Sequence, residues 1–165
     1  MEQSVYKRVT SQGSLTLFIR ESQRIEGITR DPLPREIEAH ETFLALEEVM
    51  IADLEKFVGD VAGAGLRRLP GMNVIVGSHE PPPGGPKIEA ELSELLTVLH
   101  NTVEGHSSIS PWEAHVEYET LHAFTDGNGR SGRVLWAWQM LREGRDPFAL
   151  GFLHAAYYQA LEASR

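Results

Sequence analysis

Apolar side chains recur at helical spacing through two long stretches of the chain, residues 35–58 and 87–101, with polar and charged positions between them. A period near 3.6 residues places such side chains on one helix face, which then packs against a core. Both stretches are therefore predicted to be amphipathic core helices. Their apolar positions are Ile37, Phe43, Leu44, Leu46, Met50, Ile51, Leu54 and Phe57 in the first stretch, and Ile88, Leu92, Leu95, Leu96 and Leu99 in the second.

Helix-boundary residues predict further helices in the second half of the chain. Ser110 suits the N-cap position and Pro111 the first helical position, so a helix should run from there to about residue 123. Another should run from about residue 129 to 143, where Gly144 ends it. A last helix is expected to end near residue 162.

Only one short segment has the composition of a strand. The β-branched run Val74, Ile75 and Val76 lies within residues 72–77, between a Pro-Gly pair and a loop rich in glycine and proline. This pattern favours a strand in a hairpin or flap, and an ordinary edge strand with a proline-rich loop is the alternative. The predicted fold class is mainly α, a helical bundle with a short β-hairpin.

Length and composition suit one globular domain spanning residues 1–165. The chain has no cysteine, which excludes disulfides and fits a reducing compartment, so a cytoplasmic location is expected. No apolar run approaches the length of a membrane span, so no membrane partner is expected. The net charge of −9 disfavours nucleic-acid backbones as partners.

The richest chemistry lies in residues 122–133. Gly127 and Gly129 flank Asn128, and glycines at these positions let the backbone bend so that successive N–H groups converge on an anion. A helix beginning near Arg130 would add its positive N-terminal dipole. The stretch is therefore predicted to bind phosphate groups.

Reactive side chains surround this glycine turn. Arg130 and Arg133 are three residues apart, so on a helix they share a face and can clamp phosphate oxygens. Asp126 supplies a hard oxygen ligand of the kind that Mg²⁺ accepts when it also binds phosphates. His122 is the one group here whose ordinary pKa suits general-base work at neutral pH.

The commoner phosphate loop does not fit this stretch. Gly127 and Gly132 have its spacing, but Arg133 replaces its lysine and Val134 replaces its Ser or Thr. The pattern His-x-Phe-x-Asp-Gly-Asn-Gly-Arg-x-x-Arg instead resembles the signature of the Fic domain family. The one departure is Ala123, where the family usually has proline, and alanine there loosens the turn. The matched residues are His122, Phe124, Asp126, Gly127, Asn128, Gly129, Arg130 and Arg133.

The resemblance implies a Fic-type helical bundle that transfers AMP from ATP to a Tyr, Thr or Ser hydroxyl of a target protein. It would use Mg²⁺ as cofactor, with ATP and the protein target as partners, and a homodimer is compatible with it. Phe124 is interpreted as a core anchor of the loop. The implied roles are His122 as base, Asp126 as metal ligand, Gly127, Asn128 and Gly129 as anion hole, Arg130 on the phosphates and Arg133 on the γ-phosphate.

A second motif lies near the N-terminus, in an inhibitory segment of about residues 14–27. Ser22, Glu26 and Gly27 resemble the family's inhibitory pattern Ser/Thr-x-x-x-Glu-Gly/Asn, in which the glutamate pairs with the second motif arginine. Glu26 would then occupy the guanidinium of Arg133 and keep the γ-phosphate out. The alternative is an exposed helix end, with Glu26 solvated and Gly27 as its C′ cap.

The resemblance also gives the strand at residues 72–77 a role. A hairpin ahead of the motif helix in similar proteins pairs with the target backbone by strand addition, so Val74, Ile75 and Val76 are candidate target-binding residues.

Other functions stay open at this stage. Relatives with an altered motif, such as the Doc branch, transfer phosphate, whereas the Gly129-Arg130 pair here matches the AMP-transferring pattern. Removal of AMP from modified protein and a nucleotide-binding regulatory module without turnover are further alternatives. His115, Glu119 and His122 also have a spacing that suits Zn²⁺, although the base role of His122 argues against zinc.

Overall fold

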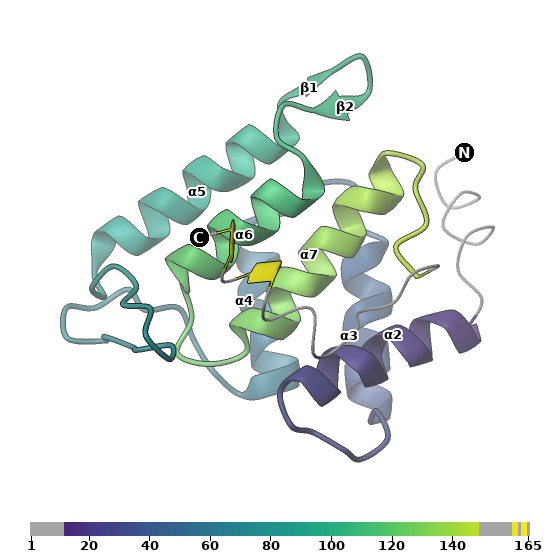
Figure 1. Cartoon of the computed structure of the whole chain (residues 1–165), viewed down its shortest axis with the longest axis horizontal. Coiled ribbons are helices and arrows are strands. Elements are labelled where there is room, and N and C mark those ends of the chain that lie inside the picture. The colour runs from purple at the N-terminus through teal and green to yellow at the C-terminus, as the bar shows by residue number, and fades with distance from the viewer. Residues whose placement is uncertain (1–11, 149–159, 162, 165) are drawn as a thin grey trace.

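The computed structural model describes residues 12–148, 160–161 and 163–164. Within them it has six named helices and one two-stranded sheet (Figure 1). The predicted mainly α fold class is confirmed, while most of the predicted last helix falls outside the described residues. Figure 1 shows the elements α2 (Gln12–Ile25), α3 (Pro34–Leu44), α4 (Ile51–Ala62), α5 (Pro86–His100), β1 (Thr102–Val103), β2 (His106–Ser107), α6 (Pro111–Leu121) and α7 (Asn128–Arg142).

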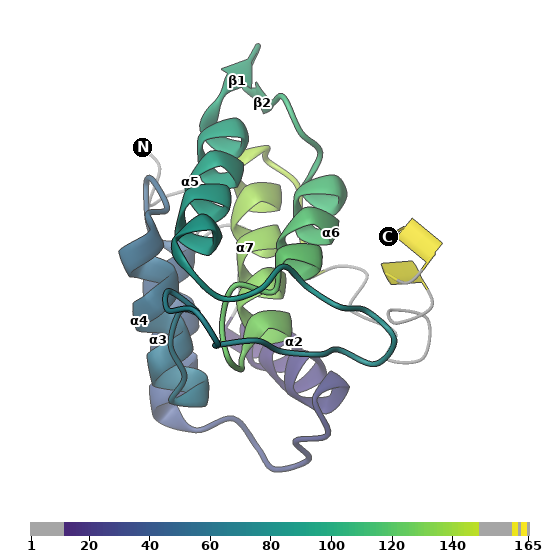
Figure 2. The ribbon, with the colours of Figure 1, turned by 90° about the vertical axis from the view of Figure 1, so that its left-hand side faces the viewer.

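Helix α7 is the central element of the bundle. It contacts α2, α3, α4 and α6, which surround it in both views (Figures 1 and 2). Twelve of its fifteen residues are buried, and a helix enclosed on all sides needs no polar face. The motif residues on α7 therefore belong to the interior of the bundle. No helix among the described residues is long and apolar enough to cross a membrane.

The predicted helices of the second half lie close to their expected bounds. The stretch 87–101 forms α5, and the helix predicted at 129–143 forms α7. The N-cap prediction for α6 is confirmed, because Ser110 Oγ accepts a hydrogen bond from Glu113 N–H at 3.2 Å. That helix ends at Leu121, two residues earlier than predicted, so that His122 lies in the following turn.

The stretch 35–58 is two helices, α3 and α4, which corrects the prediction of one. The connection keeps the apolar pattern because its own apolar residue Val49 is buried, 1% exposed. The carbonyl of Leu46 accepts a hydrogen bond from the indole of Trp138 at 2.9 Å, which ties the connection to α7. Helix α4 then begins where Asp53 Oδ2 accepts the Met50 N–H at 2.8 Å. Hydrophobic periodicity alone does not reveal such a turn between two helices.

The regular hairpin is not in the predicted segment. Strands β1 and β2 pair antiparallel, with Thr102 opposite Ser107, just before the N-terminal end of α6 (Figure 1). The strand predicted at 72–77 is wrong: that segment forms a loop with a single bridge, in which Val76 and His79 exchange hydrogen bonds of 3.0 and 2.9 Å. Figure 2 shows that this loop, which connects α4 and α5, passes close to the end of α6.

Candidate active site

His122 lies in the turn that ends α6. Its N–H donates to the carbonyl of Tyr118 at 3.1 Å, and its backbone is left-handed, with φ 50° and ψ 57°. This conformation costs a residue other than glycine roughly 1–2 kcal/mol, so the surrounding contacts must hold it. Backbone strain of this kind clusters at functional sites, which favours a functional role for His122.

The loop after His122 is closed by the side chain of Asn128. Its Oδ1 accepts the Phe124 N–H at 2.9 Å, and its Nδ2 donates to the Phe124 carbonyl, also at 2.9 Å. Phe124 itself is fully buried, which confirms it as a core anchor. The amide of Asn128 therefore stabilises the loop, and only its backbone N–H remains as a candidate for binding an anion.

The N-terminus of α7 provides the backbone groups of an anion site. Gly127 precedes the helix with φ 77°, a conformation that favours glycine, and a Cβ there would lie 2.9 Å from Ala62 Cβ. The first N–H groups of a helix have no acceptor within it. In α7 these belong to Asn128, Gly129 and Arg130, so the helix directs three donors and a positive dipole to one place.

A buried hydrogen bond holds this helix start against α6. Ser131 Oγ donates to the Gly127 carbonyl at 2.8 Å and lies 2.7 Å from the Tyr118 hydroxyl. Burial raises the pKa of Tyr118, so its hydroxyl stays protonated at any physiological pH. The start of α7 is thus bound to α6 by a buried side-chain hydrogen bond.

The pairing predicted between Glu26 and Arg133 is present. Arg133 Nη2 donates to Glu26 Oε1 at 2.6 Å, across 107 positions of sequence. Ser22 contributes two further acceptors, its Oγ at 2.8 Å from Nε and its carbonyl at 2.9 Å from Nη2. The Arg133 side chain is fully buried. Ser22 and Glu26 therefore bind the second arginine of the motif in the interior of the bundle.

Glu26 also lies against the start of α7. A Cβ added to Gly129 would collide with Glu26 Oε1, and would lie 2.9 Å from Arg133 Nη1. The absence of a side chain at Gly129 is thus what admits the carboxylate. A negative group at a helix N-terminus is stabilised by the helix dipole. The Glu26 carboxylate therefore lies at the helix N-terminus, where the dipole favours a negative group.

Both interpretations of the end of α2 hold in part. Gly27 has φ 75° and its N–H bonds to the Arg24 carbonyl at 3.0 Å, while the Ile28 N–H bonds to the Gln23 carbonyl at 3.0 Å. This is the expected geometry of a glycine C′ cap. The cap turns the chain just after Glu26, whose side chain pairs with Arg133 and is 31% exposed. The cap and the ion pair are therefore compatible features of one turn.

Arg130 has a different environment from Arg133. Its Nη1 donates to the carbonyl of Val61 at 2.7 Å, near the end of α4, and the residue is only 7% exposed. The predicted phosphate contact would thus have to use the part of its guanidinium that does not bind α4. This hydrogen bond also joins α7 to α4.

Asp126 is an exposed carboxylate at the entrance of α7. Its Oδ1 accepts the Gly127 N–H at 2.7 Å, so the side chain is held beside the helix start. Mg²⁺ needs only one or two carboxylates when phosphates and water complete its octahedron. The donor type and position of Asp126 fit such an ion.

The arrangement required for Zn²⁺ is not found. No three His, Cys, Asp or Glu side chains converge on a metal position among the residues that the structure describes. His115 and Glu119 are buried in the contact between α6 and α7, where a Cβ on Gly132 would meet both of them. Both side chains pack between the two helices, whereas His122 lies beyond the end of α6.

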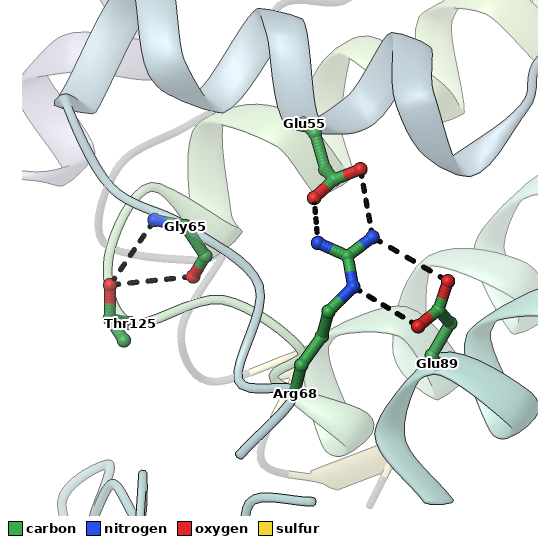
Figure 3. A network of polar contacts seen from close by, with 5 residues as sticks. All are labelled: Glu55, Gly65, Arg68, Glu89 and Thr125. Atoms are coloured by element: carbon green, nitrogen blue, oxygen red, sulfur yellow. Dashed lines mark hydrogen bonds and ion pairs between the residues drawn. The ribbon is translucent and has the colours of Figure 1, made fainter. Parts of the chain in front are cut away.

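Two adjacent arginines, Arg67 and Arg68, have opposite environments. Arg67 is fully buried and donates to the carbonyl of His122 from Nε at 2.8 Å. Arg68 is exposed and forms ion pairs with Glu55 and Glu89 (Figure 3). The sequence carries no local signal that separates the two. Arg67 is the residue of this site that the sequence analysis missed.

The loop predicted as a flap lies next to the end of α6. His79 Nε2 is 2.8 Å from the Thr120 carbonyl, which ties the loop to the helix that carries His122. Ile75 is 78% exposed, whereas Val74 and Val76 are half-buried. The three residues thus form a loop tip in which exposed Ile75 lies between two half-buried valines.

One comparison with known proteins bears on this site. The model of the Fic/DOC family matches residues 37–140, more than half of the chain. The match includes the whole stretch from His122 to Arg133 and the loop between α4 and α5, and it ends near the C-terminus of α7. Helix α2, with Ser22 and Glu26, lies outside it.

Proposed function

The chain belongs to the Fic/DOC family, and we propose that it is a protein adenylyltransferase that transfers AMP from ATP to a Tyr, Thr or Ser hydroxyl of a target protein. AMPylation-type transfer from a nucleotide to a protein is the activity at the level of the family. The observation that carries the proposal is the loop that Asn128 closes, because it sets His122 and the anion-binding start of α7 at the two ends of one turn.

His122 acts as the general base of this reaction. The target hydroxyl gives its proton to the His122 imidazole while its oxygen forms a bond to the α-phosphorus of ATP. The bond from that phosphorus to the bridging oxygen of the β-phosphate breaks, and pyrophosphate leaves. The products are an AMP ester of the target and pyrophosphate, so no further reactant is needed. The left-handed backbone of His122 supports this role, because strained backbone conformations cluster at functional sites.

The start of α7 binds the phosphates in this proposal. The N–H groups of Asn128 and Gly129, together with the Arg130 and Arg133 guanidinium groups, complement the negative charge that grows on the leaving pyrophosphate. Asp126 would hold Mg²⁺, which supplies further charge neutralisation on the phosphate oxygens when it is bound. Preorganised donors of this type need no rearrangement during the reaction.

Glu26 inhibits the transfer in the described conformation. Its carboxylate binds Arg133 Nη2 at 2.6 Å and lies against Gly129, so it competes with the terminal phosphate for both groups. ATP then binds weakly, or binds with its α-phosphate turned away from the base. The inhibitory segment, about residues 14–27, includes Ser22, which accepts a hydrogen bond from Arg133, and Gly27, whose turn directly follows Glu26.

The loop tip of Val74, Ile75 and Val76 presents the target. Its proximity to the end of α6 through His79 and Thr120 supports a docking site next to His122. An extended target segment that pairs with the loop backbone would gain register from main-chain hydrogen bonds and bring its hydroxyl to the base. The exposed side chain of Ile75 supplies apolar contact area.

The position of the transferred phosphorus tests the chemistry. ATP labelled at the α-phosphorus or at the γ-phosphorus is incubated with Mg²⁺ and the Glu26→Gly variant, and self-modification is followed. We expect label from the α-position only, and none when His122→Ala is added to the same variant. Label from the γ-position would identify a phosphotransferase. Tight ATP binding with no label from either position would instead indicate a regulatory module, and release of AMP from modified protein would indicate a hydrolase.

A further inference from the structure

The carbonyl groups at the end of α6 are bound by one residue from a distant part of the chain, Arg67. Its Nε donates to the His122 carbonyl at 2.8 Å and its Nη2 to the Leu121 carbonyl at 3.1 Å. Its backbone N–H donates to the Ala123 carbonyl at 2.9 Å. The last carbonyls of a helix have no donor within that helix. Arg67 supplies these donors to three successive residues, with His122 in the middle.

The same guanidinium also holds the base of the loop that precedes α5. Arg67 Nη1 donates to the Met72 carbonyl at 3.1 Å and to the Pro82 carbonyl at 2.9 Å. These two residues bracket the loop tip, which carries Ile75. A second tie, from His79 Nε2 to the Thr120 carbonyl at 2.8 Å, joins the loop to the same helix end. The planar guanidinium of Arg67 thus connects the loop with the turn at His122.

The burial of Arg67 makes this arrangement specific to arginine. The side chain is fully buried, and burial lowers its pKa. The acceptors of its side-chain hydrogen bonds are four carbonyls, and its positive charge lies at the negative end of the α6 dipole. Lysine carries one compact ammonium group and cannot reach acceptors on two sides as a planar guanidinium does.

We propose that Arg67 is a positioning residue for AMP transfer, which holds the left-handed backbone of His122 and docks the loop tip against it. The proposal rests on the function proposed for this site. In it, Arg67 contacts neither nucleotide nor target, and acts by keeping the base and the target-binding loop at a constant separation. A displacement of about 1 Å between reacting groups is enough to cost a large factor in rate.

Arg68 provides a matched control one residue away. It is exposed, and its partners Glu55 and Glu89 lie on α4 and α5 (Figure 3). The test uses Arg67→Met, Arg67→Lys and Arg68→Met, each in the Glu26→Gly variant, with self-modification by α-labelled ATP as readout. The saturating rate and the ATP concentration for half-saturation are measured separately.

We expect Arg67→Met to lower the saturating rate about 10- to 100-fold, with half-saturation within about threefold, because the phosphate-binding start of α7 is unchanged. Arg67→Lys should lose nearly as much, and Arg68→Met less than about twofold. Equal saturating rates for Arg67→Met and Arg68→Met would overturn the proposal. So would a loss confined to half-saturation by ATP.

Amide hydrogen exchange measures the anchoring without any enzymatic readout. In Arg67→Met, the amides of residues 72–82 and 122–125 should exchange faster than in the parent, while those of α3 exchange at the parent rate. Unchanged exchange in both segments would overturn the proposal even if transfer fell. If Arg67→Met does not fold, Arg67→Lys decides by the same two measurements. If the Glu26→Gly parent transfers nothing, the proposed function fails, whereas exchange still shows whether Arg67 anchors the turn.

Discussion

Arg133 is bound by Ser22 as well as by Glu26, and this division has a consequence for the proposed inhibition. The two bonds to Ser22 measure 2.8 and 2.9 Å and involve Nε and Nη2, while the ion pair to Glu26 uses Nη2 alone. Glu26 is 31% exposed and Arg133 is fully buried, so Glu26 is the partner in this ion pair that solvent reaches. A phosphate that displaces Glu26 would therefore meet an arginine already oriented, without any movement of α7.

His40 makes the stability of the fold sensitive to acid. It is 2% exposed, its Nδ1 lies 2.6 Å from the Glu36 carbonyl, and burial above all lowers its pKa from 6.5 to about 4. The nearby charges of Arg133 and Arg130 lower the pKa further, while that of Glu36 raises it. Between pH 6.5 and 4 the unfolded chain binds a proton at His40 that the folded chain does not. The contribution of His40 to the free energy of unfolding is therefore fully present above pH 6.5 and is lost as the pH falls toward 4.

We expect the wild type to lose about 2–3 kcal/mol of unfolding free energy through His40 between pH 7 and pH 4.5, because one pKa unit corresponds to about 1.4 kcal/mol. His40→Gln, which does not titrate, should lose correspondingly less over the same interval. Urea unfolding of both proteins at the two pH values measures the difference. Parallel losses in the two proteins would show that His40 does not titrate as argued.

At the scale of the elements, the contact between α6 and α7 depends on Gly132. A Cβ there would lie 3.0 Å from Tyr118 Cδ1 and 3.2 Å from His115 Cε1, and would collide with Glu119 Oε1. Gly132→Ala should therefore lower the unfolding free energy by about 1–3 kcal/mol, as overpacking does. Gly59 in α4 is exposed and a Cβ there meets nothing within 4 Å, so Gly59→Ala is the matched control.

Gly59→Ala should raise the unfolding free energy by about 0.5–1 kcal/mol, because alanine suits a helix interior better than glycine. Denaturant unfolding of the two variants beside the wild type gives both signs in one experiment. A stabilising effect of Gly132→Ala would mean that α6 and α7 can separate at no cost.

The elements were predictable where local chemistry defines them. Ser110 and Pro111 mark the start of α6, and Gly144, with φ 72°, follows the end of α7 as predicted. The connection between α3 and α4 escaped prediction because it carries apolar residues and neither glycine nor proline. The strand predicted at 72–77 failed for another reason: the Met72 carbonyl accepts a hydrogen bond from the Arg67 side chain, a contact that β propensity does not contain.

The site divides in the same way. The residues from His122 to Arg133 were predictable because their types and spacing fall within one short stretch, and the pairing of Glu26 with Arg133 followed from a motif. Arg67 was not predictable, since its role arises from burial against a turn 55 positions away. Neighbouring Arg68 has the same residue type and no such contact. Only the tertiary structure distinguishes the two.

At the scale of the whole molecule, helix α2, whose C-terminal end precedes Glu26, is part of the core. Leu15, Phe18 and Ile19 of α2 are buried, and α2 contacts both α3 and α7 (Figure 1). Undocking α2 would expose these side chains, at a cost of about 1.5–3 kcal/mol for each large one. Relief of inhibition is therefore expected to move Glu26 and the turn at Gly27, and to leave the rest of α2 in place.

The central claim is that Glu26 holds off AMP transfer by occupying Arg133. The most direct test is the initial rate of label incorporation from α-labelled ATP with Mg²⁺, compared among the wild type, Glu26→Gly and Glu21→Gly. Glu21 is the control because it lies on the same helix and pairs with Arg24 at 3.0 Å instead. Loss of a charge-assisted hydrogen bond of about 1.5–3 kcal/mol predicts a rate about 10- to 100-fold higher for Glu26→Gly, with Glu21→Gly close to the wild type. Equal rates for all three proteins, or a rise shared by both variants, would contradict the claim.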